Sequence, residues 1–232
     1  MPTDSRIFMS FNDLAQGLTY FLAMLFALTF HEAAHAFASH LLGDDSAKSM
    51  GRLSINPAVH MDMMGTVVFP LICAVFSAPF IGWAKPVPYD ERNFKHPVRD
   101  AMLTASAGPA SNLLLGMACM LFVALNAKFQ WSIFEAGQIL SPFIKLATAM
   151  IYVNGMLAFL NLIPLPPLDG STIMRAFVSR DFWEKYESAV APYGFVIFLV
   201  LAYSGGLNWI SSLTLAYVQI LNALISPMVA AL

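Results

Sequence analysis

The chain has 232 residues, of which 58% are hydrophobic and only 11% are charged. Soluble domains average about 25% charged residues, so this composition excludes an ordinary soluble protein and predicts an integral membrane protein. The formal net charge of −2 offers no basic field to a nucleic acid. The two cysteines, Cys73 and Cys119, both lie in apolar runs, and we interpret them as small buried hydrophobes, neither a disulfide nor a metal pair.

The first predicted helix occupies residues 14–42. A bilayer-spanning helix needs about 20 mostly apolar residues, and this stretch meets that length. Residues 1–12 lack the basic region of a signal peptide, and no small-residue cleavage site closes the apolar run. We therefore expect the first run to be retained as a helix.

The region between this helix and the next clear span is less regular. Residues 51–57 alternate polar and apolar side chains, which predicts a short strand or an extended loop. Residues 64–83 are apolar but contain Pro70 and Pro79, so they form either a plain span or a re-entrant hairpin. Basic residues precede and follow this segment, and the positive-inside rule then favours a hairpin that enters and leaves on the cytoplasmic side.

The remaining spans are predicted at residues 101–126 and 139–163, joined by an amphipathic link at 128–137. The apolar tail from 190 to 232 is broken at Gly205-Gly206 and forms one or two helices. We predict an all-α polytopic membrane protein with a three-helix catalytic core, a re-entrant or strand-containing segment and one or two C-terminal helices. It is expected to be a single domain, 1–232, with the core at about 14–174 and the C-terminal membrane helices at about 189–232.

A possible metal site lies inside the first span, at His31-Glu32-Ala33-Ala34-His35. Helical residues four apart lie about 40° apart around the axis and about 6 Å apart along it, so both histidines can face one ion. Glu32 flanks the same sector and can take a proton from an attacking water. Ionisable groups at membrane depth are costly and usually functional. His40 faces elsewhere, and we interpret it as an interfacial histidine.

The candidate third ligand is Asp169. Catalytic zinc usually has three protein ligands, and two histidines leave it one short. Asp169 follows a proline-rich turn at the end of the 139–163 span, near the same membrane face. The alternative is that Asp169 only caps a helix that begins near Ser171.

Two longer patterns resemble the site-2 protease family of intramembrane zinc metalloproteases. His31 to His35 matches the family signature HExxH, and residues 161–170, Asn-Leu-Ile-Pro-Leu-Pro-Pro-Leu-Asp-Gly, match NxxPxPxLDG. Residues 108–112, Gly-Pro-Ala-Ser-Asn, match the GPxxN element of the middle core helix. The stretches 56–62 and 82–88 resemble a compact bacterial and archaeal branch that lacks PDZ and CBS domains.

The resemblance covers roughly residues 26–174 and implies a function for each matched position. A zinc-dependent endopeptidase would cleave transmembrane protein substrates in the bilayer of a prokaryotic inner membrane, with its active site toward the cytoplasm. Zn²⁺ would be the cofactor. The implied roles are zinc ligands for His31, His35 and Asp169, general base for Glu32, a substrate contact for Asn161, and orientation of the scissile peptide for Asn112.

Alternatives from other classes remain open at this point. A non-catalytic zinc-binding membrane protein or a metal transporter would use the same ligands, but it would not need Glu32 beside the first of them. A lipid-modifying hydrolase is chemically possible as well. A substrate strand could pair with an edge in residues 51–56, which weakly favours a peptide substrate.

Overall fold

The computed structural model describes residues 11–75, 82–129 and 141–231, and the regular elements in these residues are all helical. Most of the predicted 128–137 link lies outside them. The described part contains five helices that are long and apolar enough to cross a membrane, which confirms the predicted all-α polytopic class. These candidate spans are Ala15–Leu41, Pro97–Phe129, Ser141–Asn161, Arg180–Tyr203 and Asn208–Ala231.

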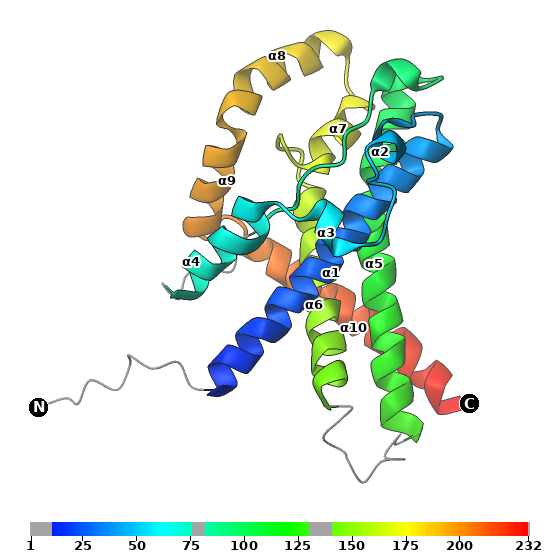
Figure 1. Cartoon of the computed structure of the whole chain (residues 1–232), viewed down its shortest axis with the longest axis vertical. Coiled ribbons are helices and arrows are strands. Elements are labelled where there is room, and N and C mark those ends of the chain that lie inside the picture. The colour runs from blue at the N-terminus through cyan, green and yellow to red at the C-terminus, as the bar shows by residue number, and fades with distance from the viewer. Residues whose placement is uncertain (1–10, 76–81, 130–140, 232) are drawn as a thin grey trace, which may run out of the picture.

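Three of these helices form the core: α1 (Phe11–Leu41), α5 (Pro97–Phe129) and α6 (Ser141–Asn161) pack against one another (Figure 1). Ala23 of α1 meets Ala149 of α6, and Cys119 of α5 packs beside them. Small side chains let helices approach closely in a bilayer, where packing replaces the hydrophobic effect as the source of association. Cys119 is a free, partly buried thiol.

The C-terminal tail forms two further helices, α9 (Gly194–Tyr203) and α10 (Asn208–Ala231), separated at Gly205, whose φ is +80°. Helix α10 crosses α5 and α6 (Figure 1). The Tyr217 side chain of α10 lies over Gly116 and Gly155: a Cβ at Gly116 would come within 2.6 Å of the Tyr217 hydroxyl, and a Cβ at Gly155 within 3.0 Å of the ring. Its hydroxyl donates to the Leu113 carbonyl at 2.6 Å, so α10 holds the two core helices together.

The two ends of the segment at 64–83 lie next to each other. A π-helix, Met63–Val68, continues into α4 (Phe69–Val75), and the chain then comes back beside it. The Trp83 N–H donates to the Gly65 carbonyl at 3.2 Å, so the two limbs are neighbours. A span of about 20 residues would separate its ends by about 30 Å, which agrees with a re-entrant hairpin and not with a plain span. Residues 76–81, including Pro79, lie outside the described residues.

Residues 51–56 form turns and bends, so the predicted short strand is wrong and the alternative of a loop holds. The loop lies between α2 (Ser46–Ser49) and α3 (Pro57–His60). The Asn56 side chain accepts a hydrogen bond from the Ala58 N–H at 3.1 Å and caps α3. Local side-chain bonds of this kind compete with strand pairing, and the loop offers no edge of the type expected for a substrate strand.

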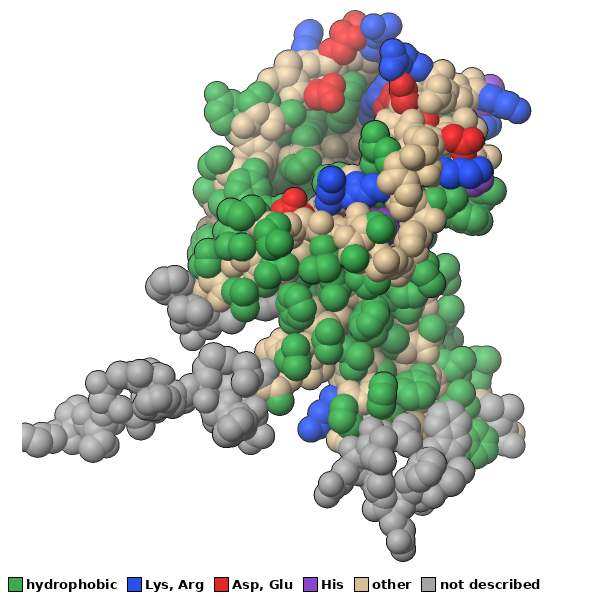
Figure 2. Space-filling view, viewed as in Figure 1, with side chains coloured by type: hydrophobic (Ala, Val, Ile, Leu, Met, Phe, Trp, Pro, Cys, Tyr) green, Lys and Arg blue, Asp and Glu red, His purple; other side chains and the backbone are tan. Residues whose placement is uncertain are grey.

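Charged side chains gather at the end of the molecule that carries α2 and α8 (Arg180–Val190), whereas hydrophobic side chains cover most of the remainder of this face (Figure 2). The Asp44 carboxylate accepts hydrogen bonds at 2.7 Å from Ser46 and from Asn93. Residues that precede and follow the hairpin therefore share one end of the molecule, as the charge pattern predicted.

A labelling experiment tests this arrangement in a membrane. With Cys73 and Cys119 replaced by alanine, Lys48→Cys and Lys95→Cys should react with a membrane-impermeant thiol reagent from the same face. Ala127→Cys, near the other end of α5, should react only from the opposite face. Labelling of Lys48→Cys and Lys95→Cys from opposite faces would contradict the hairpin.

Candidate metal centre

The two histidines of α1 meet Asp169, the first residue of α7 (Asp169–Arg175). The His31 Nε2 lies 3.0 Å from the His35 Nε2. The Asp169 carboxylate spans both rings, with Oδ2 3.1 Å from the His31 Nε2 and Oδ1 3.4 Å from the His35 Nε2. One ligand atom from each of the three residues lies within 4.8 Å of the others. The structure thus brings together all three predicted metal ligands.

Both imidazole rings are fixed from behind by hydrogen bonds at Nδ1. The His35 Nδ1 lies 2.7 Å from the Thr104 carbonyl, which can only accept, so this nitrogen carries the proton. The His31 Nδ1 lies 2.6 Å from the Asn112 Oδ1. The two amide protons of Asn112 are used elsewhere, on the Ala27 carbonyl and on Asn154, so Oδ1 is also an acceptor. In the neutral rings, both Nε2 atoms therefore present lone pairs to the cluster.

This donor set fits a divalent cation. Two imidazole lone pairs and a carboxylate face one another at about hydrogen-bond distance, and the neutral tautomers leave no proton between them. The Asp169 Oδ2 is buried without a hydrogen-bond partner, an unfavourable state that a bound cation would relieve. Two histidines and one carboxylate are a ligand set that catalytic zinc uses.

Asp169 faces the two histidines and is not the N-cap residue of α7. The N-cap residue of α7 is Leu168, and it makes no side-chain capping bond. Burial alone would raise the pKa of Asp169, but when no cation is bound, a proton on the facing imidazoles of His31 and His35 supplies hydrogen bonds and positive charge that outweigh burial and lower the pKa to about 2. The group is therefore a carboxylate at neutral pH, the form that coordinates metals.

A glycine on α5 makes room for the two rings. Gly108 faces them so closely that a Cβ built on it would lie 2.5 Å from the His35 Nε2 and 2.6 Å from the His31 Cε1. Gly108 and Asn112 are four residues apart and share one face of α5. The GPxxN pattern therefore combines the space for the rings with the side chain that orients one of them.

Glu32 projects from the same helix toward the extended segment after the hairpin. Its Oε2 accepts a hydrogen bond from the Val87 N–H at 2.8 Å. The segment around Val87 follows the return limb of the re-entrant hairpin, so the hairpin delivers a backbone donor to this carboxylate. Sequence reasoning did not identify this contact, because a main-chain donor has no residue signature.

The other residues singled out in the sequence, Asn112, Asn161 and His40, are not among the three clustered residues. Asn112 is fully buried behind His31, and its role toward a substrate stays a prediction. Asn161 ends α6 and donates to the Leu157 carbonyl at 3.0 Å, and its substrate role also stays a prediction. His40 lies 2.5 Å from Asp45 in the last turn of α1, away from the metal cluster.

Comparison with known proteins identifies the family. The sequence model of Peptidase family M50 matches residues 19–201. The chain is 36% identical over 181 residues to the Bacillus subtilis (strain 168) protein named "Putative zinc metalloprotease YwhC", and the match covers 78% of each chain. No solved structure matches the chain.

The family match covers both segments that build the cluster, and the cluster has the donor set that zinc requires. Zn²⁺ is therefore the cofactor, and the class of substrate is a protein. The chain belongs to Peptidase family M50, the site-2 protease family, and is a multi-pass membrane metalloprotease.

Proposed function

We propose that this protein is an intramembrane endopeptidase that hydrolyses peptide bonds within transmembrane segments of other proteins. The depth of the cluster carries the proposal. His35 lies six residues, and His31 ten residues, before the end of the candidate span at Leu41. At about 1.5 Å per residue, these ligands lie about 9 to 15 Å inside the helix end. A peptide bond that reaches them has to lie below the membrane surface.

The proposed roles follow from the contacts. His31, His35 and Asp169 hold zinc, while Asn112 and the Thr104 carbonyl fix the imidazole rings. The chemistry that zinc would supply when bound there is Lewis-acid polarisation of the scissile carbonyl and a lowering of the pKa of the attacking water toward about 7. Glu32 accepts the proton of the attacking water and returns it to the amine nitrogen as the C–N bond breaks.

The substrate has to be locally unwound before it can react. A transmembrane helix keeps its amides in i→i−4 hydrogen bonds, and the scissile carbonyl becomes accessible only when these open. Asn161, at the end of α6 and a few residues before the Asp169 turn, is the proposed contact for the opened strand. We also propose that residues 1–232 act as one domain.

The charged end of the molecule gives the proposed orientation. Lys48 lies in α2, just after the C-terminal end of α1, and Arg99 lies in the first turn of α5. The metal cluster is closer to this end of α1 than to the other, and cytoplasmic loops are rich in basic residues. We infer that the site opens toward the cytoplasm in a prokaryotic inner membrane. A transporter or a non-catalytic zinc protein is less well supported, because neither needs Glu32 held beside the ligands.

The first prediction concerns the general base. Glu32→Gln should reduce cleavage by about 10² to 10⁴-fold and retain zinc, since the amide keeps the shape and can still accept from the Val87 N–H. Zinc content of the purified protein and proteomics of membrane fragments from cells with either form provide the measurements. Loss of zinc in this variant would make Glu32 a ligand and contradict the proposed role.

A second prediction separates a ligand from a packing residue at Asp169. Asp169→Asn keeps the size but removes the charge, so zinc affinity should fall strongly and proteolysis should stop, with helix content unchanged. Chelator competition and circular dichroism measure these quantities. Asp181→Asn, an exposed carboxylate in the first turn of α8, is the matched control and should behave as wild type. Normal activity of Asp169→Asn would remove the third ligand.

The third prediction tests the space around the rings. Gly108→Ala should push the imidazoles apart, destabilise the fold by about 1–3 kcal/mol as overpacking does, and lower zinc content. Gly17→Ala is the control, because a Cβ added at Gly17 would have no atom within 4 Å, and it should keep zinc and stability. Thermal unfolding and elemental analysis compare the two. Equal zinc in both variants would refute the close packing.

A further inference from the structure

Arg52 is buried, yet no carboxylate among the described residues lies within ion-pair distance of it. The residue is 6% exposed, and within the described part of the chain its guanidinium donates only to backbone carbonyls. The acceptors are Val59 at 3.0 Å, Lys85 at 3.0 Å and Pro86 at 2.9 Å. Burying a cation without a nearby opposite charge is costly, so this position calls for a compensating interaction.

The compensating charge is the carboxylate of Glu32, and a single peptide group connects it to Arg52 by hydrogen bonds. The Pro86 carbonyl and the Val87 N–H belong to the same peptide unit. Its oxygen accepts from Arg52, and its N–H donates to the Glu32 Oε2 at 2.8 Å. A peptide unit has a dipole of about 3.5 D. Its negative end here faces the cation and its positive end faces the carboxylate, and hydrogen bonds in such a chain polarise and strengthen one another.

In residues 86–88, the local sequence leaves one backbone N–H that can donate to Glu32. Pro86 and Pro88 have no backbone N–H, so Val87 supplies the one amide proton of these three residues. The Lys85 N–H is already used on the His60 carbonyl at 2.9 Å. Thr66 fixes the preceding limb by donating to the Trp83 carbonyl at 2.9 Å.

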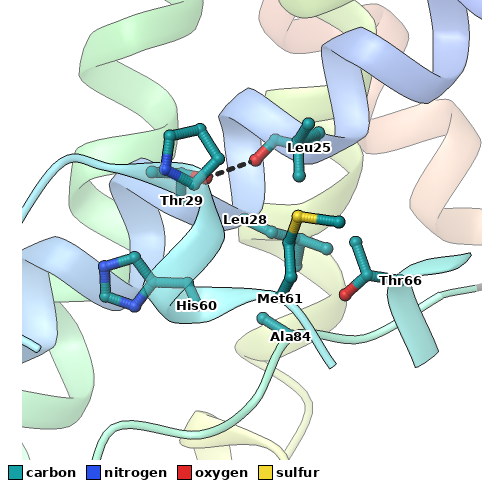
Figure 3. Close-up of a pocket in the computed structure, with 8 residues that line it drawn as sticks. Leu25, Leu28, Thr29, His60, Met61, Thr66 and Ala84 are labelled. Carbon is teal, nitrogen blue, oxygen red and sulfur yellow. Dashed lines mark hydrogen bonds between the residues drawn. The ribbon is translucent and has the colours of Figure 1, made fainter. Parts of the chain in front are cut away.

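Figure 3 shows how closely this segment lies to α1. Thr66 and Ala84, from the two limbs of the hairpin, line a small pocket together with Leu25, Leu28 and Thr29 of α1. The segment is therefore supported on both sides before it reaches Glu32. Arg52 donates to the carbonyls of Lys85 and Pro86, the last two carbonyls before the Val87 N–H.

We propose that Arg52 is a positioning residue for the general base, acting through the 86–87 peptide group. It turns the Val87 N–H toward one oxygen of Glu32 and fixes the carboxylate in the orientation that proton transfer needs. This inference rests on the proposed function of Glu32. The hydrogen bonds of Arg52 go to the carbonyls of Val59, Lys85 and Pro86 and not to the three proposed metal ligands.

The test compares Arg52→Met with Arg52→Lys in the full-length protein. Arg52→Met should lower kcat by about 10- to 100-fold, the usual effect of losing a group that orients a reactive one, with KM and zinc content unchanged. Arg52→Lys keeps a charged donor, so it should restore part of kcat. Arg92→Met is the matched control, because that arginine side chain is 89% exposed and pairs with Asp90.

A second measurement does not depend on proteolysis. In ¹⁵N-valine-labelled protein, the Val87 amide, assigned through Val87→Ile, should resonate downfield because it donates to a carboxylate. It should move upfield in Glu32→Ala, and also in Arg52→Met and Arg52→Lys, although residue 52 does not contact it directly. If the wild type cleaves no transmembrane substrate, the proposed function fails and this measurement still decides the role of Arg52.

Two outcomes would overturn the inference. One is an unmoved Val87 amide or an unchanged kcat in the Arg52 variants. The other is a joint loss of zinc and rise of KM, which would indicate a general structural role. If Arg52→Met does not fold, the test rests on Arg52→Lys alone. A wild-type kcat and an unchanged Val87 amide shift in Arg52→Lys would then refute the proposal.

Discussion

The mutual approach of two imidazole nitrogens and one carboxylate is the constraint on which the structure depends. These three groups come from α1 and α7, which are far apart in the sequence, and each presents lone pairs to the others. Without a cation the arrangement is unfavourable, so the surrounding elements have to hold it. Asn112 and the Thr104 carbonyl fix the rings from α5, and the turn before α7 fixes the carboxylate.

The same constraint explains the polar residues inside the helix bundle. Asn112 and Asn154 are both fully buried, which is costly in a bilayer unless every polar atom has a partner. Their amides bond to each other and to the carbonyls of Ala27 and Met150. The chain that orients His31 thus extends from α1 through α5 to α6, and it links the packing of the three core helices to the geometry of one ligand.

Much of the fold and the convergence of His31, His35 and Asp169 could be predicted, because a membrane span is specified by apolar length and a candidate metal site by residue spacing. Helix α5 nevertheless begins four residues before the predicted start at 101, since its first turn is polar. The strand at 51–56 was wrong, because alternation also suits a loop in which Asn56 caps the next helix. Arg52 could not be identified as a partner of Glu32, since a main-chain peptide joins them and leaves no pattern in the side chains.

The residue spacing in α5 indicates which face of this helix lies against the two histidines. Thr104, Gly108 and Asn112 follow one another at intervals of four, so they lie on one face of the helix. That face combines an open space at Gly108 with an amide at Asn112, which make room for the two rings and orient one of them. The Thr104 carbonyl that bonds His35 would be present with any residue at that position. A helix facing an HExxH motif in a membrane can therefore be recognised by such a stripe of small and polar residues.

Backbone groups recur as the anchors of the site. Carbonyls of Ala27, Thr104 and Pro86 hold Asn112, His35 and Arg52 respectively, and the Val87 N–H holds Glu32. Helix association in lipid gains little from the hydrophobic effect, so orientation has to come from close packing and hydrogen bonds. A backbone partner has no rotamers to lose, and it fixes a reactive side chain more tightly than a second flexible side chain would.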